Sequence, residues 1–205
     1  MKAIDVYEQI AREKVIAIVR RESGQEVSAV CRALVAGGLH VMELPLTMER
    51  AHRRLEAVAD ALPEALLGAG SVLDAESARI AILSGAKFLV TPAFDADVVK
   101  MGNRYGVPVF PGVHSPTEAV RALECGCMAV KLFPASEFTP AAIGAWKTPF
   151  PNLELIPTGG VGGQNAAQWL RAGAFALGVG GALCSGSAEE VRAKAARLKT
   201  IAGEA

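Results

Sequence analysis

The sequence shows no excess of either charge. Lysine and arginine together number 21, aspartate and glutamate together number 21, and the formal net charge is zero. Proteins that bind nucleic acid or anionic membranes usually carry a strongly basic face, so we expect no nucleic-acid partner and no membrane partner. No apolar run is long enough to span a bilayer, and the first residues lack a basic segment followed by an apolar one. We therefore expect a cytoplasmic protein.

Residues that bind metals are scarce. The three histidines are His40, His52 and His114, and no two of them have the H-x-x-x-H spacing of a zinc enzyme. The four cysteines include no C-x-x-C pair, so we expect small core residues rather than redox or metal sites. The sequence thus predicts a protein with no metal and no other cofactor.

Apolar residues, by contrast, are abundant. Of the 205 residues 51% are hydrophobic, and the chain also contains 21 glycines and 11 prolines, a composition typical of a globular protein. A chain of this length can bury a large core. We expect a single domain over residues 1–205.

Strand-like and helix-like segments alternate along the chain, after an amphipathic helix expected over residues 4–13. Short apolar runs predict eight strands, at residues 15–20, 39–44, 65–69, 87–91, 107–110, 128–134, 153–157 and 175–179. Each is followed by a helical pattern, and capping residues such as Asp74 and Ser115 mark where helices begin. Strands that alternate with helices pair in parallel, so we predict an α/β fold, a (β/α)8 TIM barrel with an extra N-terminal helix. An open doubly wound sheet is the alternative, which the regular repeat disfavours.

The strand at 128–134 contains one lysine among apolar residues. A buried ammonium group is costly unless it is paired or neutral. A neutral lysine is also the nucleophile that forms Schiff bases with carbonyl compounds. Lys131 is therefore a candidate nucleophile. The alternatives are a lysine that reaches solvent from the strand end and a lysine held in a structural salt bridge.

A carboxylate is expected to face the same cavity as this lysine. Side chains alternate between the two faces of a strand, so Glu43 shares a face with Val41, and Lys131 shares a face with Ala129 and Phe133. If both faces point into a barrel, Glu43 and Lys131 meet there. A purely structural Glu–Lys ion pair is the alternative interpretation.

Other polar and glycine-rich positions stand where strands end, which is the catalytic face of a barrel. The candidate side chains are Arg20, Thr47, Ser71, Pro92, Phe133 and Thr158. The pairs Gly159–Gly160 and Gly180–Gly181 follow the last two strands, where bare backbone N–H groups can bind a phosphate. This set suits Schiff-base chemistry on a phosphorylated keto acid or sugar. Two other functions stay open: a phosphate-binding isomerase or synthase with Glu43 as base, and a non-catalytic phosphometabolite-binding protein.

Eight short motifs in a characteristic order and spacing extend over essentially the whole chain. They are Ala36-Gly-Gly, Val41-Met-Glu43-Leu, Gly68-Ala-Gly-Ser71-Val-Leu, Thr91-Pro92, Phe110-Pro-Gly112, Val130-Lys-Leu-Phe-Pro-Ala135, Ile156-Pro-Thr-Gly-Gly-Val161 and Gly178-Val-Gly-Gly181. In these motifs the chain resembles the class I 2-keto-3-deoxy-6-phosphogluconate (KDPG)/4-hydroxy-2-oxoglutarate (KHG) aldolases. The resemblance implies a homotrimeric barrel lyase that cleaves KDPG to pyruvate and glyceraldehyde 3-phosphate. Cleavage of 4-hydroxy-2-oxoglutarate to pyruvate and glyoxylate is the second implied activity.

The resemblance also implies roles for individual residues. Lys131 matches the Schiff-base lysine, and Glu43 matches the general acid/base that acts through a bound water. The pyruvyl pocket and its surroundings are implied for Ser71, Pro92, Phe133 and Arg20. The substrate and phosphate loop is implied for Thr158, Gly159 and Gly160, with Gly180 and Gly181 beside it.

Two positions depart from the family pattern. Thr47 stands where some members have an arginine that holds the carboxylate, which leaves Ser71, Thr47 and Arg20 for that task. Gly181 stands where many members have a serine on the phosphate, which keeps only the backbone N–H. Glu43-Leu-Pro-Leu46 resembles a branch that acts on 2-keto-3-deoxy-6-phosphogalactonate, whereas Thr158 before a glycine pair resembles the gluconate branch. The galactonate compound is thus the alternative substrate.

Overall fold

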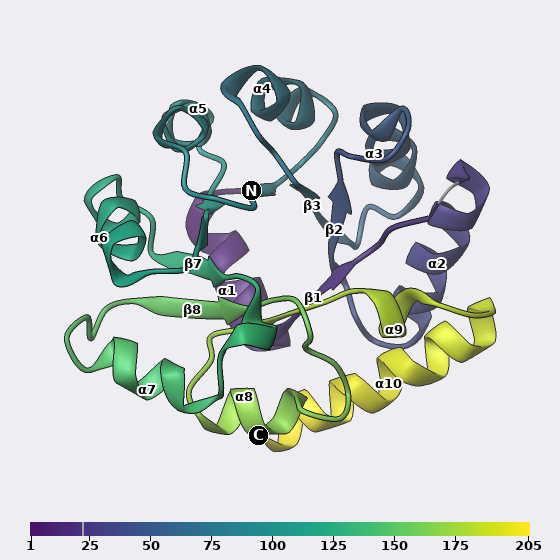
Figure 1. Cartoon of the computed structure of the whole chain (residues 1–205). Coiled ribbons are helices and arrows are strands. Elements are labelled where there is room, and N and C mark those ends of the chain that lie inside the picture. Colours follow the sequence, from purple (N-terminus) through teal and green to yellow (C-terminus); the bar gives the residue numbers. More distant parts are fainter. Residues whose placement is uncertain (22) are drawn as a thin grey trace.

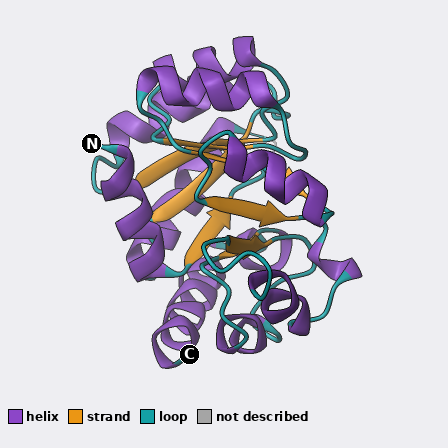
Figure 2. Cartoon of the chain, turned by 90° about the vertical axis from the view of Figure 1, so that its left-hand side faces the viewer, coloured by secondary structure: helices purple, strands orange, loops and turns teal. Residues whose placement is uncertain are grey.

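The computed structural model describes residues 1–21 and 23–205, with parallel strands at the centre and helices around them (Figures 1 and 2). The strands are β1 (Val15–Ile18), β2 (Val41–Pro45), β3 (Leu66–Gly70), β4 (Phe88–Val90), β5 (Val109–Phe110), β6 (Gly112–Val113), β7 (Ala129–Leu132), β8 (Glu154–Pro157) and β9 (Leu177–Val179). The helices are α1 (Ala3–Glu13), α2 (Gly24–Ala36), α3 (Ala51–Ala61), α4 (Ala75–Leu83), α5 (Ala96–Tyr105), α6 (Pro116–Glu124), α7 (Ala141–Lys147), α8 (Ala166–Arg171), α9 (Gly181–Cys184) and α10 (Ala188–Glu204), with a 3-10 turn η1 (Ala135–Glu137). In the described residues, no helix combines the length and the apolarity needed to cross a membrane.

The parallel strands curl into two neighbouring sheets. One has the order β5-β4-β3-β2-β1-β9 and the other the order β6-β7-β8. Between β5 and β6 the chain passes through Pro111, which has no N–H to donate, although its carbonyl accepts the N–H of Lys131 at 2.8 Å. On the other side, β8 and β9 are joined by a single bridge between Thr158 and Gly178. The predicted parallel pairing is confirmed, and the hydrogen-bonded ladder is interrupted at these two places.

The predicted strand at 107–110 is the element that differs most from the prediction. Its ladder begins only at Val109 and resumes after Pro111 as β6. The apolar residues around Pro108 and Pro111 are strand-like in composition, but a proline contributes no ladder donor. The short helix α9 was not predicted.

Helix formation follows the local signals in several places. Asp74 accepts the N–H of Ser77 at the start of α4, and Asp95 accepts two backbone N–H groups at the start of α5. Ser115 and Glu118 form a reciprocal capping box at the start of α6. Capping satisfies N–H groups that have no partner within the helix, so these polar residues determine where the helices begin.

Strand side chains divide between an inner and an outer core. Met42 on β2 and Val130 on β7 belong to the outer core, between the strands and the surrounding helices. Their neighbours Val41 and Ala129 belong to the inner core, enclosed by the strands. The full inner core is Val6, Ile10, Ile16, Val41, Leu66, Phe88, Val90, Phe110, Ala129, Ile156 and Ala176. Because α1 supplies the first two of these residues, it covers the end of the strands opposite their carboxyl ends.

This division confirms the strand parity expected from the sequence. Glu43 shares the face of Val41, and Lys131 shares the face of Ala129, so both point inward from different strands. The carboxyl ends of the strands lie above the inner core, and that is where the two side chains converge.

Candidate active site

A cavity of about 570 Å³ opens at the carboxyl ends of the strands. It brings together eleven of the twelve residues that the sequence singled out, and Thr47 alone of that set does not line it. Those lining the cavity are Arg20, Glu43, Ser71, Pro92, Lys131, Phe133, Thr158, Gly159, Gly160, Gly180 and Gly181. Residues far apart in the sequence thus share one site because parallel strands end at one edge.

Lys131 lies in the middle of β7, paired with Gly112 on one side and Ile156 on the other. The residue is only 7% exposed, and its Nζ lies 4.6 Å from the centre of the Phe133 ring. Burial lowers the pKa of the Lys131 amine; Glu43 partly opposes this effect, and the Arg20 charge adds to it. The neutral amine, which is the nucleophilic form, is therefore favoured relative to an exposed lysine.

Glu43 lies on β2 and is 3% exposed. Burial raises the pKa of its carboxyl group, and the charges of Lys131 and Arg20 act in the opposite direction. The carboxyl group occupies space that only a glycine can leave free, because a Cβ at Gly70 would lie 1.6 Å from Glu43 Oε1. Gly70 is the residue of β3 paired with Pro45 in the parallel register. The neighbouring strand is thus shaped to admit the carboxyl group.

Lys131 and Glu43 influence each other electrostatically, but their side chains form no direct ion pair. Within residues 1–21 and 23–205, neither side chain makes a hydrogen bond or a direct ion pair, although each influences the pKa of the other. A purely structural salt bridge is therefore disfavoured as an interpretation. An amine of lowered pKa beside a carboxyl group of raised pKa is an arrangement typical of catalytic acid–base sites.

Arg20 and Thr47 connect the site to a second depression. This neighbouring cavity of about 740 Å³ is lined by Arg20, Thr47 and several charged residues. Arg20, an exposed residue that follows β1, lines both cavities. Thr47 lines only the second one, so the expected group of Ser71, Thr47 and Arg20 is joined through Arg20 rather than gathered around Lys131.

The loop after β8 forms the opposite wall of the cavity. Thr158 is 4% exposed, and its hydroxyl donates to the Ile156 carbonyl at 3.2 Å. A Cβ at Gly178 would lie 2.2 Å from Thr158 Oγ1, so the glycine on β9 makes room for this side chain. Gly159 and Gly160 have φ of 88° and 81°, a conformation that disfavours other residues. The N–H group of Gly160 donates to no other residue in the part of the chain that the structure describes.

Asn165 is a cavity residue that sequence reasoning missed. Its amide nitrogen donates to the Gly160 carbonyl at 2.9 Å, and its Oδ1 accepts the N–H of Gly162 at 2.9 Å. The side chain thereby closes the glycine-rich loop on itself. An asparagine that follows two glycine pairs was the available signal, since asparagine often bonds to nearby backbone in turns. The other lining residues outside the predicted set are Ile18, Val161, Gly162, Gly163, Gln164, Gly178 and Ala182.

No group of three or more metal-binding side chains occurs among the described residues. Three of the cysteines are buried, Cys125 is partly exposed, and no disulfide joins any of the four. No cysteine lines the cavity among the described residues. Its polar lining comprises the Lys131 amine, the Glu43 carboxyl group, the hydroxyls of Ser71 and Thr158, the loop backbone, and the side chains of Arg20, Gln164 and Asn165.

Comparison with known proteins places this arrangement in a family. The family described as KDPG and KHG aldolase matches residues 6–198. The chain belongs to this family. Its members are lyases, and the predicted resemblance is confirmed over nearly the full length.

Two curated relatives are each 36% identical to this chain over the matched residues. One is a 2-dehydro-3-deoxy-phosphogluconate aldolase of Treponema pallidum, where the match covers 82% of this chain and 80% of the relative. The other is a 2-dehydro-3-deoxy-6-phosphogalactonate aldolase of Escherichia coli, with 80% and 82% covered. A solved structure of a 4-hydroxy-2-oxoglutarate/phosphogluconate aldolase superposes with a TM-score of 0.89 at 31% identity, covering 96% of this chain and 98% of the other. The prefix 2-dehydro denotes the same keto group as 2-keto.

Proposed function

We propose that the protein is a Schiff-base aldolase that cleaves KDPG to pyruvate and glyceraldehyde 3-phosphate, with cleavage of 4-hydroxy-2-oxoglutarate as a second activity. The observation that carries this proposal is the juxtaposition, in one cavity, of a buried Lys131 amine of lowered pKa and a buried Glu43 carboxyl group of raised pKa. Membership of the aldolase family supports it independently.

In the proposed reaction, the neutral amine of Lys131 attacks the C2 ketone and forms a carbinolamine. Glu43 in its protonated form gives a proton to the departing C2 hydroxyl, which leaves as water and produces the iminium ion. The resulting carboxylate then removes the proton from the C4 hydroxyl. The C3–C4 bonding electrons move into the iminium, which releases the aldehyde and leaves an enamine on Lys131. Protonation at C3 and hydrolysis of the imine release pyruvate and restore the amine.

The two ends of the substrate have separate candidate sites. We assign the phosphate to Gly159, Gly160, Gly180 and Gly181, because glycine-rich loops present backbone N–H groups that can donate to an anion, and that of Gly160 has no partner among the described residues. We assign the keto-acid end to the region of Ser71, Pro92 and Phe133, with Arg20 as the nearby cation. Thr158 lies between the two ends, and Thr47 can contribute only from the neighbouring cavity.

Cleavage of 2-keto-3-deoxy-6-phosphogalactonate is the second candidate activity. It is favoured by the relative from Escherichia coli, which matches as closely as the gluconate enzyme, and by a probable galactonate aldolase of Rhizobium meliloti that covers 88% of this chain. The two substrates differ only in configuration at one carbon. The ratio of their kcat/KM values decides between them, and a galactonate value more than tenfold higher would replace KDPG as the proposed substrate.

The first test is trapping of the covalent intermediate. The protein is incubated with pyruvate and borohydride, and its intact mass is measured beside Lys131→Ala and a control, Lys100→Ala, which removes an exposed lysine. We expect one reduced pyruvyl adduct per chain in the wild type and in the control, and none in Lys131→Ala.

The outcomes separate the three functions. An unmodified wild-type protein, under conditions that trap a known aldolase, would overturn the Schiff-base mechanism. Isomerisation or condensation of a phosphorylated substrate without an adduct would favour Glu43 acting as a base alone. Ligand binding without turnover would favour a phosphometabolite-binding protein.

We further propose that the two sheets act as one (β/α)8 barrel, with β5 and β6 as halves of one strand and α1 as the extra N-terminal helix.

We propose a single-domain, cytoplasmic enzyme that assembles as a homotrimer. The exposed apolar side chains of Ile80 and Leu83, on one side of α4, and of Leu73, just before that helix, support assembly. A cage designed from symmetric oligomeric domains shares 34% identity and a TM-score of 0.88 with this chain. Light scattering at micromolar concentration tests the trimer, and a monomer would refute it.

A further inference from the structure

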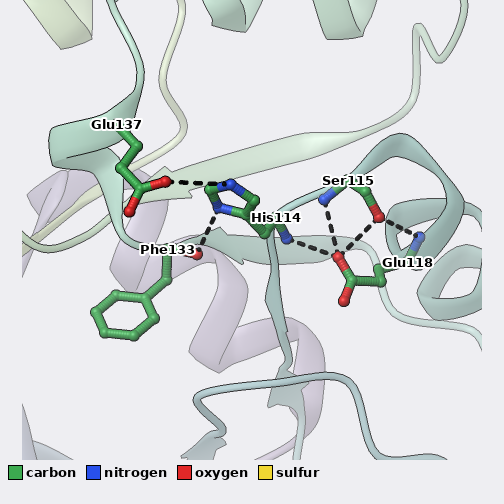
Figure 3. Close-up of polar contacts among 5 residues, drawn as sticks. All are labelled: His114, Ser115, Glu118, Phe133 and Glu137. Atoms are coloured by element: carbon green, nitrogen blue, oxygen red, sulfur yellow. Dashed lines mark hydrogen bonds and ion pairs between the residues drawn. The ribbon is translucent and has the colours of Figure 1, made fainter.

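His114 lies immediately behind the cavity wall and is not one of its lining residues. It follows β6 and is exposed to solvent, and Figure 3 shows its ring between the backbone of Phe133 and the carboxylate of Glu137. These residues come from three places in the chain: just after β6, just after β7, and η1. The imidazole therefore adds side-chain contacts just beyond the last backbone bond between these strands, in which the N–H of Phe133 donates to the Val113 carbonyl at 3.1 Å.

The first connection is to Phe133. His114 Nδ1 lies 3.2 Å from the Phe133 carbonyl oxygen, and the Phe133 ring points away from the imidazole in Figure 3. That ring lines the cavity and lies 4.6 Å from Lys131 Nζ. A hydrogen bond to the Phe133 carbonyl thus helps to determine where the ring stands relative to the amine.

The second connection is to Glu137. His114 Nε2 lies 3.5 Å from Glu137 Oε2, so both ring nitrogens face an oxygen that can only accept. Only the doubly protonated imidazolium can donate to both. The titratable groups that face His114 are acidic on both sides: Glu137 from η1, and Glu118 from α6, whose carboxylate accepts the His114 N–H at 2.9 Å.

The turn that carries Glu137 packs against the other end of the cavity. The N–H of Ala135 donates to the Thr158 carbonyl at 2.7 Å. A Cβ at Gly160 would lie 3.0 Å from the Cβ of Ser136, so η1 lies directly behind the glycine loop. Through Glu137, His114 therefore contacts the turn that supports the loop we assign to phosphate, in addition to the backbone of Phe133.

The imidazole is itself held in place. Its ring centre lies 4.8 Å from that of Phe138, which packs edge-on against Trp146 of α7. Its backbone is fixed by Glu118, which also accepts the N–H and the hydroxyl of Ser115. A side chain restrained on both sides can position its neighbours rather than merely follow them.

We propose that His114, together with Glu137, is a positioning residue that holds the Phe133 ring beside the Lys131 amine and keeps the loop after β8 in register with it. The inference rests on the proposed Schiff-base function. His114 does not touch the reacting atoms, and its effect is on the geometry in which Lys131 meets the keto acid.

The test compares four variants with the wild type in cleavage of KDPG or its galactonate epimer, whichever the wild type cleaves faster. Each rate is divided by the number of chains that form the reduced pyruvyl adduct with pyruvate and borohydride. This normalisation removes any difference between variants in the fraction of folded protein. His114→Ala is expected to lower kcat/KM about three- to tenfold, the effect of one lost hydrogen bond. His114→Asn, whose amide nitrogen can replace Nδ1, is expected to recover most of this loss. Glu137→Gln is expected to cost about twofold, since both partners are exposed. His52→Ala, on the exposed side of α3, is the matched control.

A pH series adds a readout that a purely structural histidine would not produce. Because only the imidazolium donates to both partners, the ratio of wild-type to His114→Asn kcat/KM is expected to increase as the pH is lowered. A His114→Ala variant equal to the wild type per trapped chain would overturn the inference alone. So would a His114→Asn variant as impaired as His114→Ala. A wild-type protein that forms no adduct would instead overturn the proposed function, and this inference with it.

Discussion

Gly70→Ala should disable catalysis by displacing a carboxyl group that the substitution does not chemically alter. The new Cβ would lie 1.6 Å from Glu43 Oε1 and 2.2 Å from its Cδ. Gly70 has no positive φ, so the backbone accepts alanine and the steric conflict is with Glu43 alone among the nearest atoms. The perturbation is therefore a specific displacement of the Glu43 carboxyl group.

The size of the effect follows from that overlap. Normal contacts between heavy atoms are about 3.5 Å, so the carboxyl oxygen must move by roughly 2 Å. A misplacement of about 1 Å in a catalytic group can reduce the rate about 100-fold. We therefore expect kcat to fall at least that far. We also expect a loss of about 1–3 kcal/mol in the free energy of unfolding, because overpacking in a buried site costs that much.

Two measurements test this reasoning. Cleavage is assayed by coupled detection of pyruvate, beside Gly68→Ala, which overpacks the same strand against the Phe88 ring at 2.3 Å and has ring atoms as its three nearest contacts. Gly68→Ala should lose comparable stability but retain activity per folded molecule. Urea unfolding then compares Gly70→Ala alone and in a Glu43→Ala background, where the cost should largely disappear because the clashing side chain is gone.

Either of two results would refute the argument. A Gly70→Ala enzyme with wild-type kcat per folded molecule would show that the position of Glu43 is not limiting. An unchanged stability cost in the Glu43→Ala background would show that the substituted alanine clashes with something other than the carboxyl group.

Two further predictions concern stability, and a third concerns substrate binding. Burial lowers the pKa of Lys131 below its usual 10.5, so the unfolded chain binds this proton more tightly than the folded chain does. In a Glu43→Gln background, the free energy of unfolding should therefore rise as the pH approaches 10.5. Urea titrations should show that adding Lys131→Met removes this rise. Glu13→Ala should cost about 2–4 kcal/mol in urea unfolding, because Glu13 accepts two backbone N–H groups at the start of β2, at 2.6 and 2.7 Å; the exposed Glu8→Ala should cost under about 0.5 kcal/mol, and equal losses would contradict this role. Asn165→Ala should raise KM for the phosphorylated substrate about fivefold while leaving pyruvate trapping unchanged, since it unties only the loop after β8; slower trapping would count against that assignment.

Much of the fold and of the site could be predicted from local patterns. The alternation of apolar runs with helical segments predicted the parallel strands, and the capping residues Asp74 and Ser115 marked helix starts that the structure confirms. The two-residue period of a strand was sufficient to predict that Glu43 and Lys131 point inward together. These features depend on residues close together in the sequence, where covalent geometry allows the backbone only a few conformations.

Other features depended on distances between distant segments. The space that Gly70 leaves for Glu43, the seat of Thr158 against Gly178, and the contact of His114 with Glu137 all require the register of separate strands and loops. The location of Thr47 outside the main cavity was equally invisible in the sequence. By itself the sequence determined which residues turn inward and which chemistry they bring. Only the tertiary structure decided which of them meet, because register and loop packing result from many weak contacts across the whole chain, and no local pattern records their sum.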